Sequence, residues 1–124
     1  MNASEQALHA YTTTRTPVQT PRNTEHSAFE KVTARLVEAA RATAPMTTRA
    51  AALHDNRKLW TLLAADVADA GNALPQQLRA QLFYLAEFTL LHSRKALSED
   101  APLAPLIDIN TAVMRGLRGE EAAA

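Results

Sequence analysis

The stretch DNRKLWTLLAADV, residues 55–67, has the periodicity of one amphipathic helix and decides the fold class of the chain. At about 100° per residue, apolar side chains recur on one face of this helix. That face comprises Leu53, Trp60, Leu63 and Val67. Asn56 falls close to the middle of the same face, and Arg57 lies beside it. The stretch therefore predicts a helix that turns an amide toward the core.

The rest of the chain follows the same helical pattern, because glycine is scarce and no window alternates over a β-rich composition. We predict an all-α protein, a single small helical bundle of about five helices forming one domain over residues 1–124. The predicted helices cover residues 3–13, 24–42, 47–70, 75–97 and 105–117. Extended connectors are expected at residues 14–23 and 98–104, and a frayed tail at residues 118–124.

Threonine, glycine and proline mark the expected ends of the third and fourth helices, which are the longest. Thr47 or Thr48 is expected to cap the third helix, and Gly71 follows its end. Pro75 is placed at the first turn of the fourth helix, where a missing N–H costs nothing.

The fourth predicted helix is apolar on nearly all sides. One face, which we expect to lie toward the core, is formed by Leu78, Leu82, Leu85, Phe88 and His92. A second face, opposite the first, is formed by Phe83, Ala86 and Leu90 and is interrupted by Arg79, Glu87 and Arg94. Such a helix is either central in its bundle or half-covered by a partner, and the central position is the favoured interpretation.

Basic and acidic residues balance, with 13 Lys and Arg against 13 Asp and Glu, so the formal net charge is zero. Nucleic acid and anionic membranes favour proteins with a basic excess. The balance therefore argues against either of them as the main partner.

The chain has no cysteine, which excludes disulfides and thiolate metal sites. Its start, MNASEQ, has neither the basic residues nor the apolar run of a secretion signal. No segment approaches the length of a membrane span. We therefore expect a cytoplasmic protein.

Side chains that could carry chemistry are not grouped in the sequence. The four histidines are His9, His26, His54 and His92, and none has a second ligand at metal-binding spacing. Asp66 and Asp69 share a helix face but have no obvious proton-transfer partner. There is no glycine-rich phosphate loop and no serine in a nucleophile elbow. We expect no enzyme activity, no metal and no cofactor.

The amides are the unusual feature, because Asn110 also lies within an apolar stripe, on the fifth predicted helix. A buried, unpaired amide costs about 1–3 kcal/mol, so both Asn56 and Asn110 need partners. The favoured hypothesis is that they bond to backbone groups of the proline-rich connectors; the alternative is that they bond a partner's backbone. Arg57 fits either role. Trp60 is expected in the core, since it lies on the apolar stripe.

In several sequence segments the chain resembles the bacterial flagellar protein FlaF family. The matching segments are AY at residues 10–11, TPRNTE at 20–25, ALHDNRKLW at 52–60, DVADAGNALPQQLRAQL at 66–82 and LIDINTAVMRGL at 106–117. The residues of these motifs that we single out are Tyr11, Pro21, Arg22, Asn56, Arg57, Trp60, Asn72, Pro75, Arg79 and Asn110. Together the motifs cover nearly the whole chain, and none of them departs from the family pattern.

The resemblance implies a small, non-enzymatic cytoplasmic protein that supports flagellin production and export. Its implied partner is flagellin, whose amphipathic terminal helices need covering before export, in the manner of a secretion chaperone. The alternative is a post-transcriptional regulator of flagellin synthesis that acts with a partner regulator such as FlbT. Direct contact with RNA is disfavoured, because no basic patch is interleaved with aromatic residues.

A helix-in-groove mechanism follows as a hypothesis. Its candidate groove is the second face of the fourth helix, Phe83, Ala86 and Leu90, together with Leu62 from the third helix. A third possibility is that two copies of the chain form a homodimer through the same face.

Overall fold

The computed structural model describes residues 21–117, and every regular element among them is an α-helix. The helices are α2 (Pro21–Ala39), α3 (Met46–Ala68), α4 (Gln76–Ser98) and α5 (Ala104–Leu117). The all-α class is confirmed, with four helices described where about five were predicted. The predicted helix at residues 3–13 and the tail at 118–124 lie outside the described part of the chain. No helix of residues 21–117 is long and apolar enough to cross a membrane.

Proline sets the beginnings of three of these helices. α2 begins at Pro21, so the predicted connector at residues 14–23 is wrong in its last part; proline is favoured in a first helical turn. The predicted threonine cap of α3 is also wrong. Its N-cap is Pro45, before both threonines, and it makes no side-chain cap bond. Pro75 is the N-cap of α4, one residue before the first turn in which it was predicted, and it marks the start of that helix.

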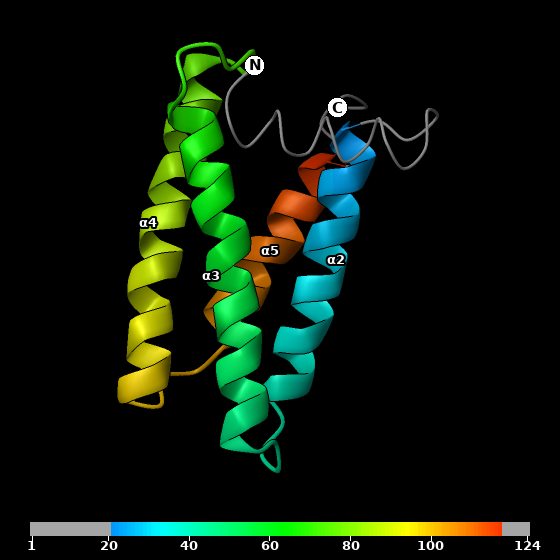
Figure 1. The fold of residues 1–124 in the computed structure, drawn as a ribbon, viewed down its shortest axis with the longest axis vertical. Coiled ribbons are helices and arrows are strands. Elements are labelled where there is room, and N and C mark those ends of the chain that lie inside the picture. The colour runs from blue at the N-terminus through cyan, green and yellow to red at the C-terminus, as the bar shows by residue number, and fades with distance from the viewer. Residues whose placement is uncertain (1–20, 118–124) are drawn as a thin grey trace.

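The four described helices form a bundle in which α3 has the central place. α3 packs against α2 on one side and α4 on another, while α2 also packs against α5. Figure 1 shows α3 and α4 running in opposite directions, with α4 at one edge of the bundle. The prediction that the fourth helix is central is therefore wrong.

The side chains that α4 buries explain its place at the edge. They are Ala86, Thr89, Ser93 and Ala96, a narrow stripe of small residues that permits close approach to one neighbouring helix. The hydroxyl of Ser93 is satisfied within α4, where it donates to the Thr89 carbonyl at 2.7 Å. Leu78 and Phe88, predicted to face the core, are instead 40% and 37% exposed. Periodicity alone did not identify the core face because the large residues flank a buried stripe of small ones.

The core consists of two clusters that lie along the bundle. One comprises Leu36, Ala39, Ala52, Leu53, Ala96, Leu103 and Leu106, and the other comprises Phe29, Trp60 and Ala86. In the second cluster, the rings of Phe29 and Trp60 meet edge to face with centroids 5.6 Å apart. The predicted core position of Trp60 is confirmed.

Candidate functional site

A polar layer, formed by Asn56, Trp60 and Asn110, crosses the interior between α3 and α5. All three side chains are fully buried, with 0% exposure. The indole nitrogen of Trp60 donates to Oδ1 of Asn110 at 2.8 Å. Nδ2 of Asn110 donates in turn to Oδ1 of Asn56, also at 2.8 Å. The predicted bonding of these amides to connector backbone is wrong, because their partners are side chains of the facing helix.

The tryptophan fixes the orientation of both amides. An indole N–H can only donate, so the oxygen of Asn110 must face Trp60. The nitrogen of Asn110 then faces Asn56, whose oxygen must accept. This order leaves Nδ2 of Asn56 buried and without a partner among residues 21–117. The layer therefore determines how α5 is rotated against α3, at the cost of one unpaired donor.

Asn72 and Arg79 close the turn between α3 and α4. Arg79 donates from Nε to the Val67 carbonyl at 2.9 Å and from Nη2 to the Asp69 carbonyl at 2.8 Å. Asn72 donates to the Asp66 carbonyl at 3.1 Å and accepts from the N–H of Leu74 at 2.9 Å. These bonds satisfy carbonyls that the end of a helix leaves without intrahelical donors. The guanidinium charge also suits the negative end of the α3 dipole.

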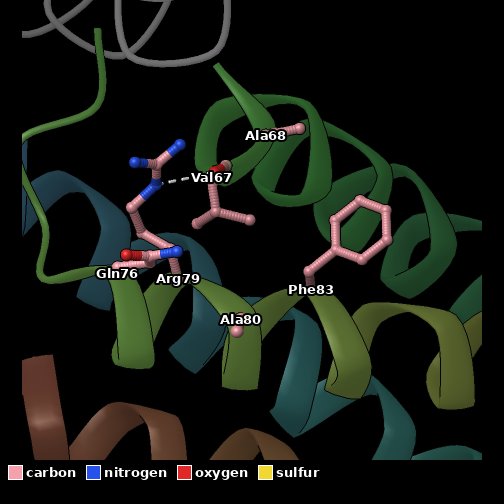
Figure 2. A pocket seen from close by; sticks show the side chains of 6 residues that line it. All are labelled: Val67, Ala68, Gln76, Arg79, Ala80 and Phe83. Carbon is pink, nitrogen blue, oxygen red and sulfur yellow. Dashed lines mark hydrogen bonds between the residues drawn. The ribbon is translucent and has the colours of Figure 1, made fainter. Parts of the chain in front are cut away.

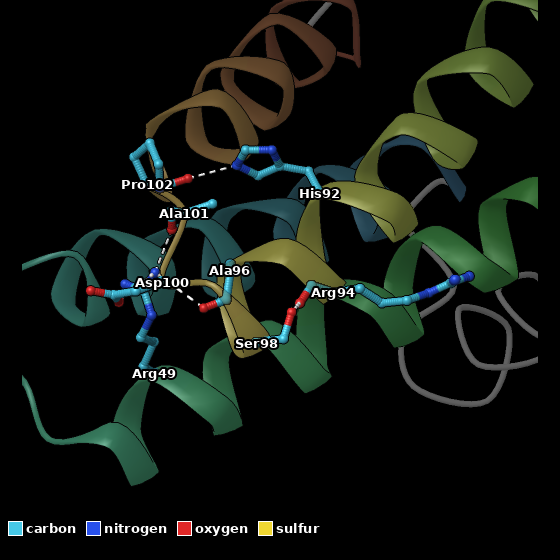
Figure 3. Close-up of polar contacts among 8 residues, drawn as sticks. All are labelled: Arg49, His92, Arg94, Ala96, Ser98, Asp100, Ala101 and Pro102. Carbon is cyan, nitrogen blue, oxygen red and sulfur yellow. Dashed lines mark hydrogen bonds and ion pairs between the residues drawn. The ribbon is translucent and has the colours of Figure 1, made fainter.

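Arg49 donates to backbone carbonyls at the C-terminal end of α4, as Arg79 does at the C-terminal end of α3. Its guanidinium donates to the Ala101 carbonyl and, at 3.4 Å, to the Ala96 carbonyl. The same guanidinium lies 3.3 Å from the Asp100 carboxylate (Figure 3). Pro102, in the connector between α4 and α5, also bonds to α4: its carbonyl lies 2.7 Å from the ring Nε2 of His92. Each helix of the α3–α4 hairpin thus supplies an arginine from its first turns to the C-terminal end of the other.

The sequence carries a signal for this exchange that helical periodicity alone does not contain. Arg49 and Arg79 each follow a helix-initiating proline by four residues, as PMTTR and PQQLR. The backbone N–H of each arginine bonds the carbonyl of its own proline, Arg49 to Pro45 and Arg79 to Pro75. The repeat places both arginines at the same position of two antiparallel helices, each beside the other's end.

The four residues of the predicted groove do not line one common surface. Ala86 is only 1% exposed and packs in the core cluster with Trp60, so its assignment to an open groove is wrong. Phe83 is 40% exposed and Leu62 is 47% exposed, while Leu90 is half-buried. Leu62 is six residues from Ala68, an α3 residue that lines the same hollow as Phe83, so roughly 120° around the helix separates the side chains of Leu62 and Ala68. Leu62 is not among the residues that line the hollow with Phe83.

An open hollow of about 410 Å³ lies at Phe83, between the end of α3 and the start of α4. Its lining residues are Val67, Ala68, Gln76, Arg79, Ala80 and Phe83, shown in Figure 2. Apolar side chains from both helices meet there, with Gln76 and Arg79 as the polar members. The hollow is large enough to admit an apolar side chain of a partner.

Ala86→Leu tests the corrected position of this residue. We expect the variant to lose about 1–3 kcal/mol of unfolding free energy, because added methyl and methylene groups must force α4 away from α3. Urea denaturation followed by circular dichroism measures the loss. Ala80→Leu, at an exposed position six residues earlier, is the matched control and should change stability by less than about 0.5 kcal/mol. Equal stability of the two variants would contradict a buried Ala86.

Large apolar side chains also lie on the face of α4 that points away from α3. Tyr84, Phe88 and Leu91, here named the outer stripe, are 67%, 37% and 51% exposed. The ring of Phe88 stacks on that of His92 with centroids 5.6 Å apart. The outer stripe went unrecognised in the sequence because Phe88 was assigned to the core face.

The remaining motif residues are distributed along the chain. Pro21 and Arg22 lie in the first turn of α2, and Tyr11 lies outside the described residues. Arg57 is exposed on α3 and forms no ion pair or side-chain hydrogen bond with residues 21–117. Within that same range, no group of His, Cys, Asp and Glu side chains could hold a metal ion.

The fold and these surfaces define a small helical bundle with apolar side chains displayed on an edge helix. The model of the family described as flagellar protein FlaF matches residues 7–117, and the chain belongs to this family. The match spans every motif residue singled out in the sequence, from Tyr11 to Asn110. No curated protein matches the chain, and no solved structure matches it.

Proposed function

We propose that this protein is a non-enzymatic flagellar biogenesis factor that binds flagellin in the cytoplasm and supports its production and export. Membership of the FlaF family supports the flagellar role. The observation that carries the binding role is the hollow at Phe83, where exposed apolar surface from α3 and α4 meets. An amphipathic terminal helix of flagellin can place an apolar residue there and lie against α4.

The chemistry of the hollow suits a cargo that is later released. Ala68, Ala80 and Phe83 offer a small accessible apolar contact beside the buried Val67, while Gln76 offers an amide at the rim. Burying one large side chain contributes about 1.5–3 kcal/mol, which is enough for recognition but not for permanent attachment. Because the contact is apolar, its affinity should depend only weakly on salt, unlike an RNA complex.

Phe83→Asp is expected to weaken the binding of purified flagellin monomer by about tenfold or more, since it places a charge in the apolar contact. Isothermal titration calorimetry at low and moderate salt measures the dissociation constant. The substitution is at an exposed position and should leave the circular dichroism spectrum unchanged. Leu90 is half-buried, so a charge there would also perturb folding and is best avoided.

Val37→Asp is the matched control, because Val37 is an exposed apolar residue of α2, 49% accessible and away from the hollow. It should bind flagellin as the unmodified protein does. Unchanged affinity in Phe83→Asp would show that the hollow is not the site. No flagellin binding by the unmodified chain would overturn the proposal and favour the regulator that acts with an FlbT-like partner.

A further inference from the structure

The outer stripe of α4 has the spacing of a helix-pairing seam. Tyr84, Phe88 and Leu91 are separated by four and then three residues, and the same alternation extends to Gln81 and Lys95. Such a seam turns one face of a helix toward a second helix. Within residues 21–117 nothing covers it, since its three apolar members remain exposed. We propose that the seam pairs with the same seam of a second copy of this chain, with the two α4 helices antiparallel.

The residues of the seam complement one another when the two-fold axis passes between Thr89 and Leu90. Phe88 then lies opposite Leu91 of the second copy, and this apolar contact occurs twice. The same axis brings Lys95 opposite Tyr84 of the second copy, where the ammonium can rest on the ring face. An antiparallel pair therefore covers the whole outer stripe without burying an unpaired charge.

Two exposed charges on one flank of the seam support the same register. Glu87 and Arg94 are seven residues apart, roughly 10 Å along the helix, and neither forms an ion pair within the described range 21–117. In an antiparallel pair related by a two-fold axis, the same flank of both helices meets. Glu87 then lies beside Arg94 of the second copy, and the reverse contact forms at the other end.

A parallel pair is disfavoured by Lys95, which would face Lys95 of the second copy. Pairing of two copies also meets no long-range repulsion, because the formal net charge of the chain is zero. A second copy in this register covers the apolar seam, places Lys95 opposite the Tyr84 ring and pairs both flanking charges. This inference does not rest on flagellin binding, since it concerns the purified chain alone.

Sedimentation equilibrium of the purified full chain, from about 1 to 200 μM, tests the pairing. The unmodified protein should show a monomer–dimer equilibrium in that range. Glu87→Arg should weaken the dimer by roughly tenfold, because it replaces two attractive contacts by two repulsive ones. Arg94→Glu should do the same. The double variant with both substitutions should restore the original dissociation constant within about threefold.

Phe88→Asp and Leu91→Asp should each leave only monomer, with the circular dichroism spectrum showing that the fold is kept. Lys31→Glu, a charge reversal at an exposed position of α2, is the control and should leave the dimer unchanged. A protein that is monomeric throughout the range would overturn the proposal, and so would a double variant as weak as the single ones. If the unmodified chain stays monomeric while Phe88→Asp loses flagellin, the stripe serves a foreign helix instead of a second copy.

Discussion

Replacing Asn110 by alanine is expected to lower the free energy of unfolding by about 3–5 kcal/mol. The substitution removes both hydrogen bonds of the polar layer and leaves the Trp60 N–H and the Asn56 oxygen buried without partners. It also opens a cavity at a fully buried position. Because Trp60 is the only tryptophan in the chain, its fluorescence during urea denaturation follows the layer directly.

Thr111→Ala, at the next residue of α5, provides the matched control. The Thr111 hydroxyl is half-buried and bonds only the Ile107 carbonyl of its own helix, at 2.8 Å. Its loss should cost less than about 1 kcal/mol. A similarly small loss of unfolding free energy for Asn110→Ala would mean that Trp60 and Asn56 are not left with unpaired buried groups. That result would contradict the buried polar layer.

Replacing Arg79 by methionine should lower the free energy of unfolding by about 2–4 kcal/mol. Methionine keeps most of the apolar stem but removes the two bonds that the guanidinium makes with the carbonyls of Val67 and Asp69. Arg79→Lys should recover only part of the loss, since one ammonium cannot reproduce the fork of the guanidinium. Thermal and urea denaturation both measure the difference.

Arg57→Met is the control for this series, because Arg57 is exposed on α3 and has no partner within residues 21–117. It should change stability by less than about 0.5 kcal/mol. If Arg79→Met and Arg57→Met proved equally mild, the capping of α3 by Arg79 would contribute nothing to stability.

The helices themselves could be predicted from the sequence, because their ends are marked by residues with strong local preferences. Pro75 marks the beginning of α4, and the run of apolar residues around Trp60 marks α3. The predicted start of α3 was late because threonine caps were preferred over Pro45, which caps the helix without a side-chain bond. Local propensity thus gives the element but not always its first residue.

Contacts between helices could not be predicted in the same way. Helical periodicity shows that Asn56 and Asn110 lie on core faces, but only the register of α3 against α5 makes them each other's partners. Likewise, the wheel of α4 offered two apolar faces and could not say that Ala86 and its small neighbours are the buried ones. Side-chain size decides this, because small residues let helices approach closely while large ones on the flanks stay accessible.

The exchange of arginines between α3 and α4 has a consequence for how the bundle opens. Each arginine sits near the start of one helix and bonds backbone at the end of the other, so fraying at either tip of the hairpin also removes a bond from the neighbouring helix. Neither helix can unwind from its C-terminal end without uncovering carbonyls that the other had satisfied. We therefore expect α3 and α4 to open together in local unfolding, so that a partner bound on α4 contacts a surface whose two helices open and close as one unit.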